Sequence, residues 1–298
     1  MKKVLIAILA VVALASCQQE DAPQGVKYPI LFGSTDTRAV ADLADLKVSG
    51  FKVYAYVQGN AGSTSFAKDV VYNADNSVWA FESPEYWIPY TTYSFKAFYP
   101  ATLTAGTLEV DNDDENQNFT ITGYDITTQE DIMVAEATAS VGADASAPAS
   151  GSVVELNFKH LLACVVVKIK AEVNVTINNV SLKYVPVNGS YADGLWSYSS
   201  QGNIEKDGLN KSLSSSSNEY HDVTDGGFLA FPSSVSGTSL FIRTSDKTYE
   251  LPLQAPDSWV AGNRYTYTLT IKQNDILFDE PTVEEWDEEN ATGSVVIK

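Results

Sequence analysis

Apolar and polar residues alternate with a period of two along much of the chain. The longest example covers residues 263–273, where Tyr265, Tyr267, Leu269 and Ile271 fall on one side and mostly threonines fall on the other. Successive side chains of a β-strand point to opposite faces, so this pattern is typical of a strand with one face buried. Half-buried strands belong to antiparallel sheets, and we expect residues 263–273 to form one.

Shorter stretches repeat this pattern, and turn-forming residues separate them. The stretches cover residues 48–57, 93–99, 173–177, 239–243 and 249–253. Gly, Asn and Asp residues mark turns at 59–60, 193–194, 207–208 and 225–227. Beyond the first seventeen residues no helical periodicity extends over ten residues, although residues 43–46 could form a turn or two. The sequence therefore predicts an all-β fold, with sandwiches favoured over a barrel because the chain looks divisible.

One stretch marks where the chain divides. Residues 137–152 are rich in Ala, Ser, Gly and Pro and offer little to pack. The 281 residues after Cys17 are enough for two cores. We expect one β-sandwich over residues 39–150 and a second over residues 151–298.

Residues 1–17 carry an export signal. Two lysines precede an apolar run of eleven residues at 4–14, which is too short for a membrane span because a span needs about twenty. The run ends in the sequence LASC, residues 14–17, which resembles the bacterial lipobox. Cys17 is therefore expected to carry the lipid, and two or three acyl chains hold a protein on a membrane almost permanently.

The polar residues after Cys17 fit a tether between the lipid and the folded body. Glu20 and Asp21 resemble the surface-export signal of lipoproteins in Bacteroides-like bacteria. The expected location is the outer membrane, at the cell surface or in a fimbrium.

Charge and cysteine content exclude several kinds of partner. Removal of the signal takes away two lysines and no acidic residue, so the formal net charge changes from −19 to −21. Such a surface repels nucleic acid and anionic lipid, and we expect no nucleic-acid partner. The remaining cysteine, Cys164, lies in the apolar run 161–167 and is interpreted as a core residue without a disulfide.

The sequence offers no catalytic constellation. Histidine is the usual general base, and only His160 and His221 occur. His160 stands in a predicted strand beside apolar residues and is interpreted as structural. His221, next to Asp222, lies between a Ser-rich loop and a strand and is interpreted as part of a surface pair. No nucleophile elbow, Gly-rich phosphate loop or zinc-protease motif is present. We predict no enzymatic activity and no cofactor.

Two features of the sequence suggest a binding site, a possible calcium loop and a high content of aromatic residues, and each also has a purely structural interpretation. Asp111, Asp113 and Glu115 alternate as EF-hand ligands do, but Asn116 and Thr122 stand where the loop needs glycine and glutamate. We interpret this segment as a solvated acidic loop and predict no metal. The sixteen tyrosines and five tryptophans could stack on sugars, so a surface glycan-binding lipoprotein of β-sandwich architecture is the alternative function.

Six short motifs, taken in order, resemble those of the fimbrillin family, the type V pilins of Bacteroides-like bacteria. They are FGSTDTRAV at 32–40, YSFKAFYP at 93–100, DIMVA at 131–135, FKHLLA at 158–163, AGNRYTYTLTI at 261–271 and TVEEW at 282–286. The resemblance implies two transthyretin-like β-sandwiches in tandem. It implies a structural pilus subunit that serves adhesion, with other pilin subunits and an arginine-specific protease as partners. It identifies no receptor.

The resemblance also implies assembly by donor-strand exchange. The protease cuts near the mature N-terminus, the strand before the cut leaves, and a strand of a neighbouring subunit fills the groove. Arg38 matches the cleavage arginine, so residues 18–38 would comprise the tether and the removable strand. That strand should bury four alternating side chains, worth together about 6–12 kcal/mol as an upper bound. They are Val26, Tyr28, Ile30 and Phe32.

The donor strand is expected within residues 276–298. Only twelve residues follow Trp286, which is short for a strand that spans a whole groove. A cleavable arginine argues against a retained anchor subunit. Between the other two kinds of subunit, we favour a stalk over a tip. The apolar residues expected to enter the groove are Ile276, Phe278, Val283, Val295 and Ile297.

Overall fold

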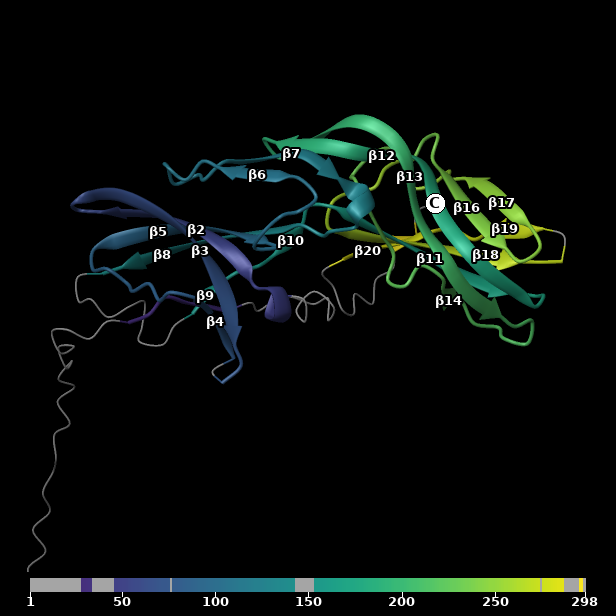
Figure 1. The fold of residues 1–298 in the computed structure, drawn as a ribbon, viewed down its shortest axis with the longest axis horizontal. Helices are drawn as coiled ribbons and strands as arrows, with labels where there is room; N and C mark the ends of the chain where they lie inside the picture. Colours follow the sequence, from purple (N-terminus) through teal and green to yellow (C-terminus); the bar gives the residue numbers. More distant parts are fainter. Residues whose placement is uncertain are drawn as a thin grey trace, which may run out of the picture.

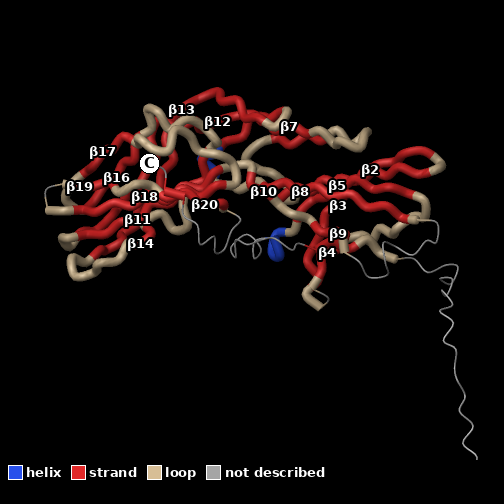
Figure 2. Tube along the Cα trace, turned by 180° about the vertical axis from the view of Figure 1, so that it is seen from behind, coloured by secondary structure: helices blue, strands red, loops and turns tan. Residues whose placement is uncertain are grey.

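The computed structural model describes residues 28–33, 46–75, 77–142, 153–273 and 275–286, together with the backbone of residues 295–296. Within these residues helix is confined to one turn at 46–49 and the 3-10 turn η1 (Ile126–Thr128). Figure 2 shows that strands make up nearly all the remaining regular structure. The prediction of an all-β fold is confirmed.

Eight strands form one sheet, which we call the N-terminal lobe (Figure 1). Their order across the sheet is β10-β8-β5-β2-β3-β4-β1-β9, and β9 also lies beside β8, so the sheet curls around its core. Buried and less buried residues alternate along its strands as a half-buried strand requires. The strands are β1 (Leu31–Gly33), β2 (Phe51–Gly59), β3 (Gly62–Asn73), β4 (Val78–Phe81), β5 (Thr91–Tyr99), β8 (Met133–Val141), β9 (Val154–Glu155) and β10 (Lys159–His160).

Two further sheets of the described residues pack together as the C-terminal lobe. The first contains β11 (Ala163–Ala171), β14 (His221–Asp222), β15 (Phe228–Ala230), β18 (Asn263–Ile271), β19 (Ile276–Phe278), β20 (Thr282–Glu285) and β21 (Val295–Val296). The second contains β6 (Thr107–Val110), β7 (Phe119–Asp125), β12 (Val175–Ala192), β13 (Leu195–Leu213), β16 (Ser239–Thr244) and β17 (Thr248–Pro252). Figure 1 shows the two lobes side by side along the long axis.

Each lobe has its own hydrophobic core, and each core draws on residues from both sides of position 150. The larger core, in the C-terminal lobe, includes Ile121 and Tyr124. The smaller core, in the N-terminal lobe, includes Val154, Leu156 and Phe158. These contacts show that the chain crosses between the lobes more than once. The domain boundary between residues 150 and 151 stays a prediction.

The strand with the clearest alternation is paired differently from its prediction. β18 runs parallel to β11 over eight residue pairs, with Cys164 opposite Arg264 and Ala171 opposite Ile271, and antiparallel to β19 and β20. Its predicted inward residues are buried, but so are Thr266 and Thr270. The expectation of a solvent-facing side was wrong, because threonine is small and β-branched and fits a covered face as well as an exposed one.

The proposed division at residues 137–152 also starts too early. β8 continues to Val141 and pairs along its length with β5, so residues 137–141 are strand despite their small side chains. Small residues suit this position because Ala137 and Ala139 pack against the N-terminal core. The remainder, residues 143–152, lies outside the described residues.

Candidate strand-binding site

β1 occupies an interior position in the N-terminal sheet. It pairs antiparallel with β4, placing Leu31 opposite Ala80, and parallel with β9, placing Phe32 opposite Val154. The Leu156 N–H donates to the Gly33 carbonyl at 2.9 Å. A strand in this position satisfies backbone groups on two neighbours rather than one.

The backbone pairing continues before β1 along the loop that follows β4. The Ile30 N–H donates to the Glu85 carbonyl at 2.8 Å, and the Trp87 N–H donates to the Tyr28 carbonyl at 3.0 Å. Pro29, which has no N–H to leave unpaired, is exposed between them and bridges to Tyr86. Residues 28–33 therefore form one continuous extended segment.

Three predicted side chains of the removable strand lie where the alternation requires. Ile30 and Phe32 are fully buried, and Tyr28 packs half-buried against the same core. The Phe32 ring lies edge-on to Phe81 at 5.2 Å and to Phe95 at 5.4 Å between centroids. Edge-to-face contacts of this kind add to the free energy of burial. Phe32 is thus a central residue of the core and also part of the segment predicted to leave.

The remaining predicted residues at the N-terminal end, Cys17, Val26 and Arg38, lie outside the described residues. Arg38 follows the last residue of β1 by five positions in the sequence.

The described parts of the C-terminal arm, up to Trp286 and at residues 295–296, belong to the C-terminal lobe. Ile276 is buried opposite Ile271, whereas Phe278, opposite Leu269, is 37% exposed. Val283 lies opposite Tyr265 and packs against the larger core.

Beyond Val283 the arm ends in a buried tryptophan. The Trp286 ring stacks on His160 at 3.6 Å between centroids, and its backbone N–H donates to the Gly262 carbonyl at 2.7 Å. Further along, the backbone of Val295 pairs with Val283 in β20–β21, and Ile297 lies outside the described residues.

The two histidines and the cysteine that were candidates for catalysis all lie in structural environments. His160 is buried, with its Nδ1 atom 2.7 Å from Asp131 Oδ2. His221 is exposed, with its Nε2 atom 3.0 Å from the Ser217 hydroxyl. Cys164 is buried and its Sγ donates to the Gly226 carbonyl. These environments match the structural interpretation made from the sequence.

The acidic loop and the tryptophans also have structural settings. Asp111 and Asp113 are exposed, and the Asp113 N–H donates to the Asp111 carboxylate. Across the part of the chain that the structure describes, no three His, Cys, Asp or Glu side chains gather to hold a metal ion. Four of the five tryptophans are buried, and the fifth, Trp196, donates its indole N–H to the Leu161 carbonyl. The tryptophans therefore build the cores rather than an exposed sugar-stacking surface.

Sequence reasoning missed the residues that hold β1. The backbone of residues 85–87 and strand β9 form much of the site, yet neither carries a distinctive residue pattern. Residue 154 lies more than a hundred positions from β1, and backbone pairing depends little on side-chain identity. No signal in a single sequence could have located these partners.

Fold and site together define an all-β protein whose N-terminal segment completes the first sheet. The chain belongs to the fimbrillin-like family, whose family model matches residues 37–286. A second model, for the prokaryotic membrane lipoprotein lipid attachment site, matches residues 1–18. The resemblance drawn from the six motifs and the lipobox is confirmed, and the chain is a membrane-anchored lipoprotein of a family of fimbrial structural proteins. None of the helical turns in the described ranges is long and apolar enough to cross a membrane.

Solved structures share this fold. A fimbrial protein from Bacteroides vulgatus ATCC 8482 is 17% identical with a TM-score of 0.60, over 88% of this chain and 100% of that one. Candidate cell adhesion proteins from Bacteroides uniformis ATCC 8492 and Bacteroides ovatus ATCC 8483 are 18% and 20% identical. Both have TM-scores of 0.55 and cover 89% of this chain, with 99% and 100% of their own chains covered. At these identities the likeness establishes the fold alone. No curated protein sequence matches the chain.

Proposed function

We propose that this chain is a non-enzymatic pilus subunit, anchored in the outer membrane by a lipid on Cys17 and activated by proteolysis at Arg38. Other pilin subunits and an arginine-specific protease are its partners. The assembled fibre serves adhesion, the role named for two of the fold relatives. The single observation that carries the proposal is the position of residues 28–33, which lie interior to a sheet and bury Ile30 and Phe32 just before the proposed cut.

Loss of residues 28–33 would leave an apolar groove and unpaired backbone groups in the N-terminal sheet. Burial of Ile30 and Phe32 is worth together about 3–6 kcal/mol as an upper bound. Their departure would also strip backbone partners from β4, β9 and the loop at 85–87. Unpaired edges next to an apolar groove bind an added strand, since main-chain hydrogen bonds supply affinity and side-chain pockets supply selectivity.

In this proposal, proteolysis lowers the effective concentration of residues 28–33 at their own site. While the chain is intact, residues 28–33 are tethered a short distance from their site, so a strand from another subunit competes against a high local concentration. A cut at Arg38 removes the tether without changing any contact in the sheet. The resident strand can then dissociate into solution, and a competing strand replaces it.

The C-terminal arm supplies the donor in this proposal. Val295 and Ile297 are two residues apart, as are Ile30 and Phe32, so the pair matches the spacing of the two buried positions. Ile276, Phe278 and Val283 form the base of the arm on β18, where two of them contact the larger core. The residues after Trp286 would leave β20, where Val295 pairs with Val283, and carry the strand to the neighbour.

Substitution of the cleavage residue tests the proposal. An Arg38→Ala variant, treated with an arginine-specific protease, should stay lipidated, uncut at this position and monomeric. The parent should yield residues 39–298, a chain of 260 residues by mass, and polymerise. Arg243→Ala is the matched control, because it removes an exposed arginine that pairs with Asp207 and leaves the proposed cut intact. Polymer formed by Arg38→Ala at the parent's rate would refute the proposal.

A further inference from the structure

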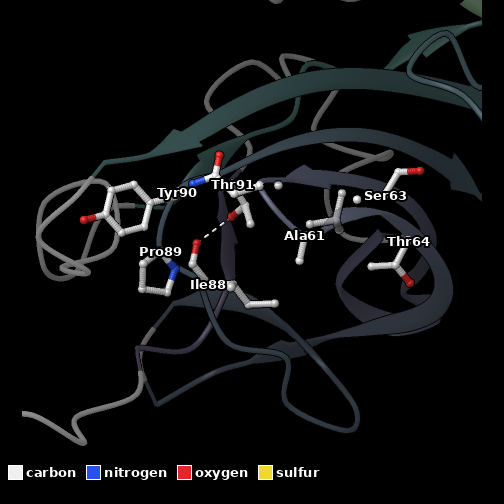
Figure 3. Close-up of a pocket in the computed structure, with 11 residues that line it drawn as sticks. Ala61, Ser63, Thr64, Ile88, Pro89, Tyr90 and Thr91 are labelled. Carbon is white, nitrogen blue, oxygen red and sulfur yellow. Dashed lines mark hydrogen bonds between the residues drawn. The ribbon is translucent and has the colours of Figure 1, made fainter.

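A cavity of about 360 Å³ opens at the outer end of the N-terminal lobe. It lies between the turn that joins β2 to β3 and the loop that leads into β5 (Figure 3). Although the chain carries a formal net charge of −19, every residue that lines the cavity is uncharged. Ile88, on its wall, is 52% exposed. The lining includes Val57, Ala61, Thr64, Ile88, Pro89 and Thr91.

The register of the strand site leads to this cavity. Pro29 lies opposite Tyr86, and Tyr28 bonds to Trp87, so each step back along the strand is one step forward along the loop. A strand that continues two residues beyond Tyr28 in the same register reaches Pro89. Pro89 belongs to the cavity wall.

The direction of the side chains agrees with this register. Alternate residues of a strand share a face, so a residue two positions before Tyr28 faces inward with Ile30 and Phe32. On the facing strands, Val57 of β2 and Thr91 of β5 are the outermost buried residues of their inward rows, and both line the cavity. The hydroxyl of Tyr93, in the same row as Thr91, accepts the Ile88 N–H at 3.0 Å. The loop wall of the cavity is therefore fixed to the core.

The geometry points to this cavity as the outermost subsite of the strand site, where an apolar side chain from a neighbouring subunit's strand binds. This inference rests on the proposed strand exchange and adds a specificity position to those of Tyr28, Ile30 and Phe32, four residues before the one that replaces Ile30. Its uncharged lining selects an aliphatic side chain over a charged one. In this chain's own segment that position is Val26.

Peptide exchange tests the subsite. Protein cut at Arg38 is mixed with fluorescent peptides of residues 24–33, and incorporation is followed by anisotropy. A Val26→Ser peptide should bind roughly ten-fold more weakly than the parent peptide, as expected for loss of one buried aliphatic side chain. A Lys27→Ser peptide, altered on the opposite face, is the matched control and should bind within about two-fold of the parent.

Protein variants supply the complementary arm. Ala61→Trp, on the exposed turn, fills the cavity and should abolish the difference between the parent and Val26→Ser peptides. Ile88→Asp places a charge on the cavity wall and should also abolish this difference, because the cavity no longer favours an aliphatic side chain. The subsite is refuted, while the strand site stands, if the Val26→Ser and Lys27→Ser peptides bind alike and neither protein variant changes the affinity ratio between the parent and Val26→Ser peptides. If no peptide enters the cut protein at all, strand exchange and the subsite both fail.

Discussion

At the scale of single residues, the strand site depends on a few buried side chains whose burial was readable from alternation. Ile30 and Phe32 were predicted to face inward because they share one side of an alternating segment, with Pro29, Leu31 and Gly33 on the other, and both do. What the alternation could not supply was the identity of the rings around Phe32, since Phe81 and Phe95 are set by the folding of distant strands.

Phe32→Ala should be the most damaging substitution in the segment. Removal of a fully buried phenylalanine costs about 3–5 kcal/mol, from lost transfer free energy and the cavity left behind. Leu31→Ala, on the opposite face and only partly buried, is the control and should cost less than half as much. Urea unfolding of the intact chain measures both, and equal losses would show that residue 32 does not anchor the segment.

Asp222 offers a residue-scale prediction about pH. Partial burial alone would raise the pKa of its carboxyl, but hydrogen bonds from the Gly226 N–H, the Thr224 hydroxyl and the Thr224 N–H outweigh it. With the nearby Lys211 charge, they hold the pKa below its usual value of 3.8. A carboxyl with a lowered folded-state pKa stabilises the fold above the unfolded-state pKa and loses that contribution as pH falls through the folded-state value.

Asp222→Asn should therefore destabilise the C-terminal lobe at pH 7 by about 1–2 kcal/mol, the range for lost hydrogen bonds to a charged acceptor that is partly solvated. The gap between the parent and the variant should narrow as pH falls below 3.8, because the parent's carboxyl becomes protonated while the amide does not titrate. Free energies of unfolding at several pH values between 7 and 2.5 measure the gap. A gap that does not change with pH would contradict the assignment.

At the scale of elements, strand existence was predictable and strand partners were not. The expected strands at 93–99 and 239–243 were found as β5 and β16 nearly to the residue, because period-two burial reports one strand at a time. The Asp207-Gly208 pair, expected as a turn, lies inside β13 where the register with β12 shifts. Glycine at φ 68° and Asn210 at φ 49° accommodate the irregularity there, and one sequence cannot distinguish a bulge from a turn.

The partners of the C-terminal arm were likewise not predictable from the sequence, and deletion of the arm tests its role. A chain ending at Trp286 keeps β19, β20 and the stack on His160, so its C-terminal lobe should unfold within about 0.5 kcal/mol of the parent. It should fail to elongate a fibre, since Val295 and Ile297 are gone, while its own groove still accepts a strand.

A chain ending at Gln273 is the informative comparison. It loses β19, β20 and β21 as well as the Trp286 stack, and should be destabilised by at least about 3–5 kcal/mol, the cost of deleting a buried tryptophan. An elongation assay on this chain therefore cannot separate a folding defect from loss of the donor strand. The chain ending at Trp286 keeps its fold, so its assay reports on the donor strand alone. Normal elongation by the chain ending at Trp286 would place the donor elsewhere.

At the scale of the whole molecule, the β6–β7 hairpin is one of the contacts between the two lobes, beside the stack of Trp286 on His160. β7 pairs with β12 of the C-terminal lobe and β6 pairs with β7, and the loop between β6 and β7 reaches the N-terminal sheet. Phe119 of β7 stacks on Tyr191 in one lobe and lies edge-on to Phe98 in the other. In the proposed fibre the groove is in one lobe and the donor arm in the other, so pulling force crosses this junction.

Buried amides fix the loop of that hairpin to the N-terminal sheet. Asn112 donates to the carbonyls of Ala55 at 3.2 Å and Phe66 at 3.0 Å. Gln117 is 1% exposed, and its side-chain amide donates to the Tyr54 carbonyl at 2.9 Å and to Asn112 Oδ1 at 2.7 Å. Such a network stabilises only when every member is satisfied, because a buried acceptor left without a donor costs free energy.

Gln117→Ala should uncouple the lobes. It leaves the Tyr54 carbonyl and Asn112 Oδ1 without this donor, at a cost of about 1–3 kcal/mol placed at the junction rather than in either core. Hydrogen exchange in increasing urea should show β2 and β3 opening before β11 and β18 in the variant, whereas in the parent all four open together. Asn118→Ala, an exposed neighbour on the same loop, is the control and should behave as the parent. If the four strands still open together in Gln117→Ala, other contacts hold the lobes together, such as those of Phe119 and the stack of Trp286 on His160, and the amide network is not what makes them one mechanical unit.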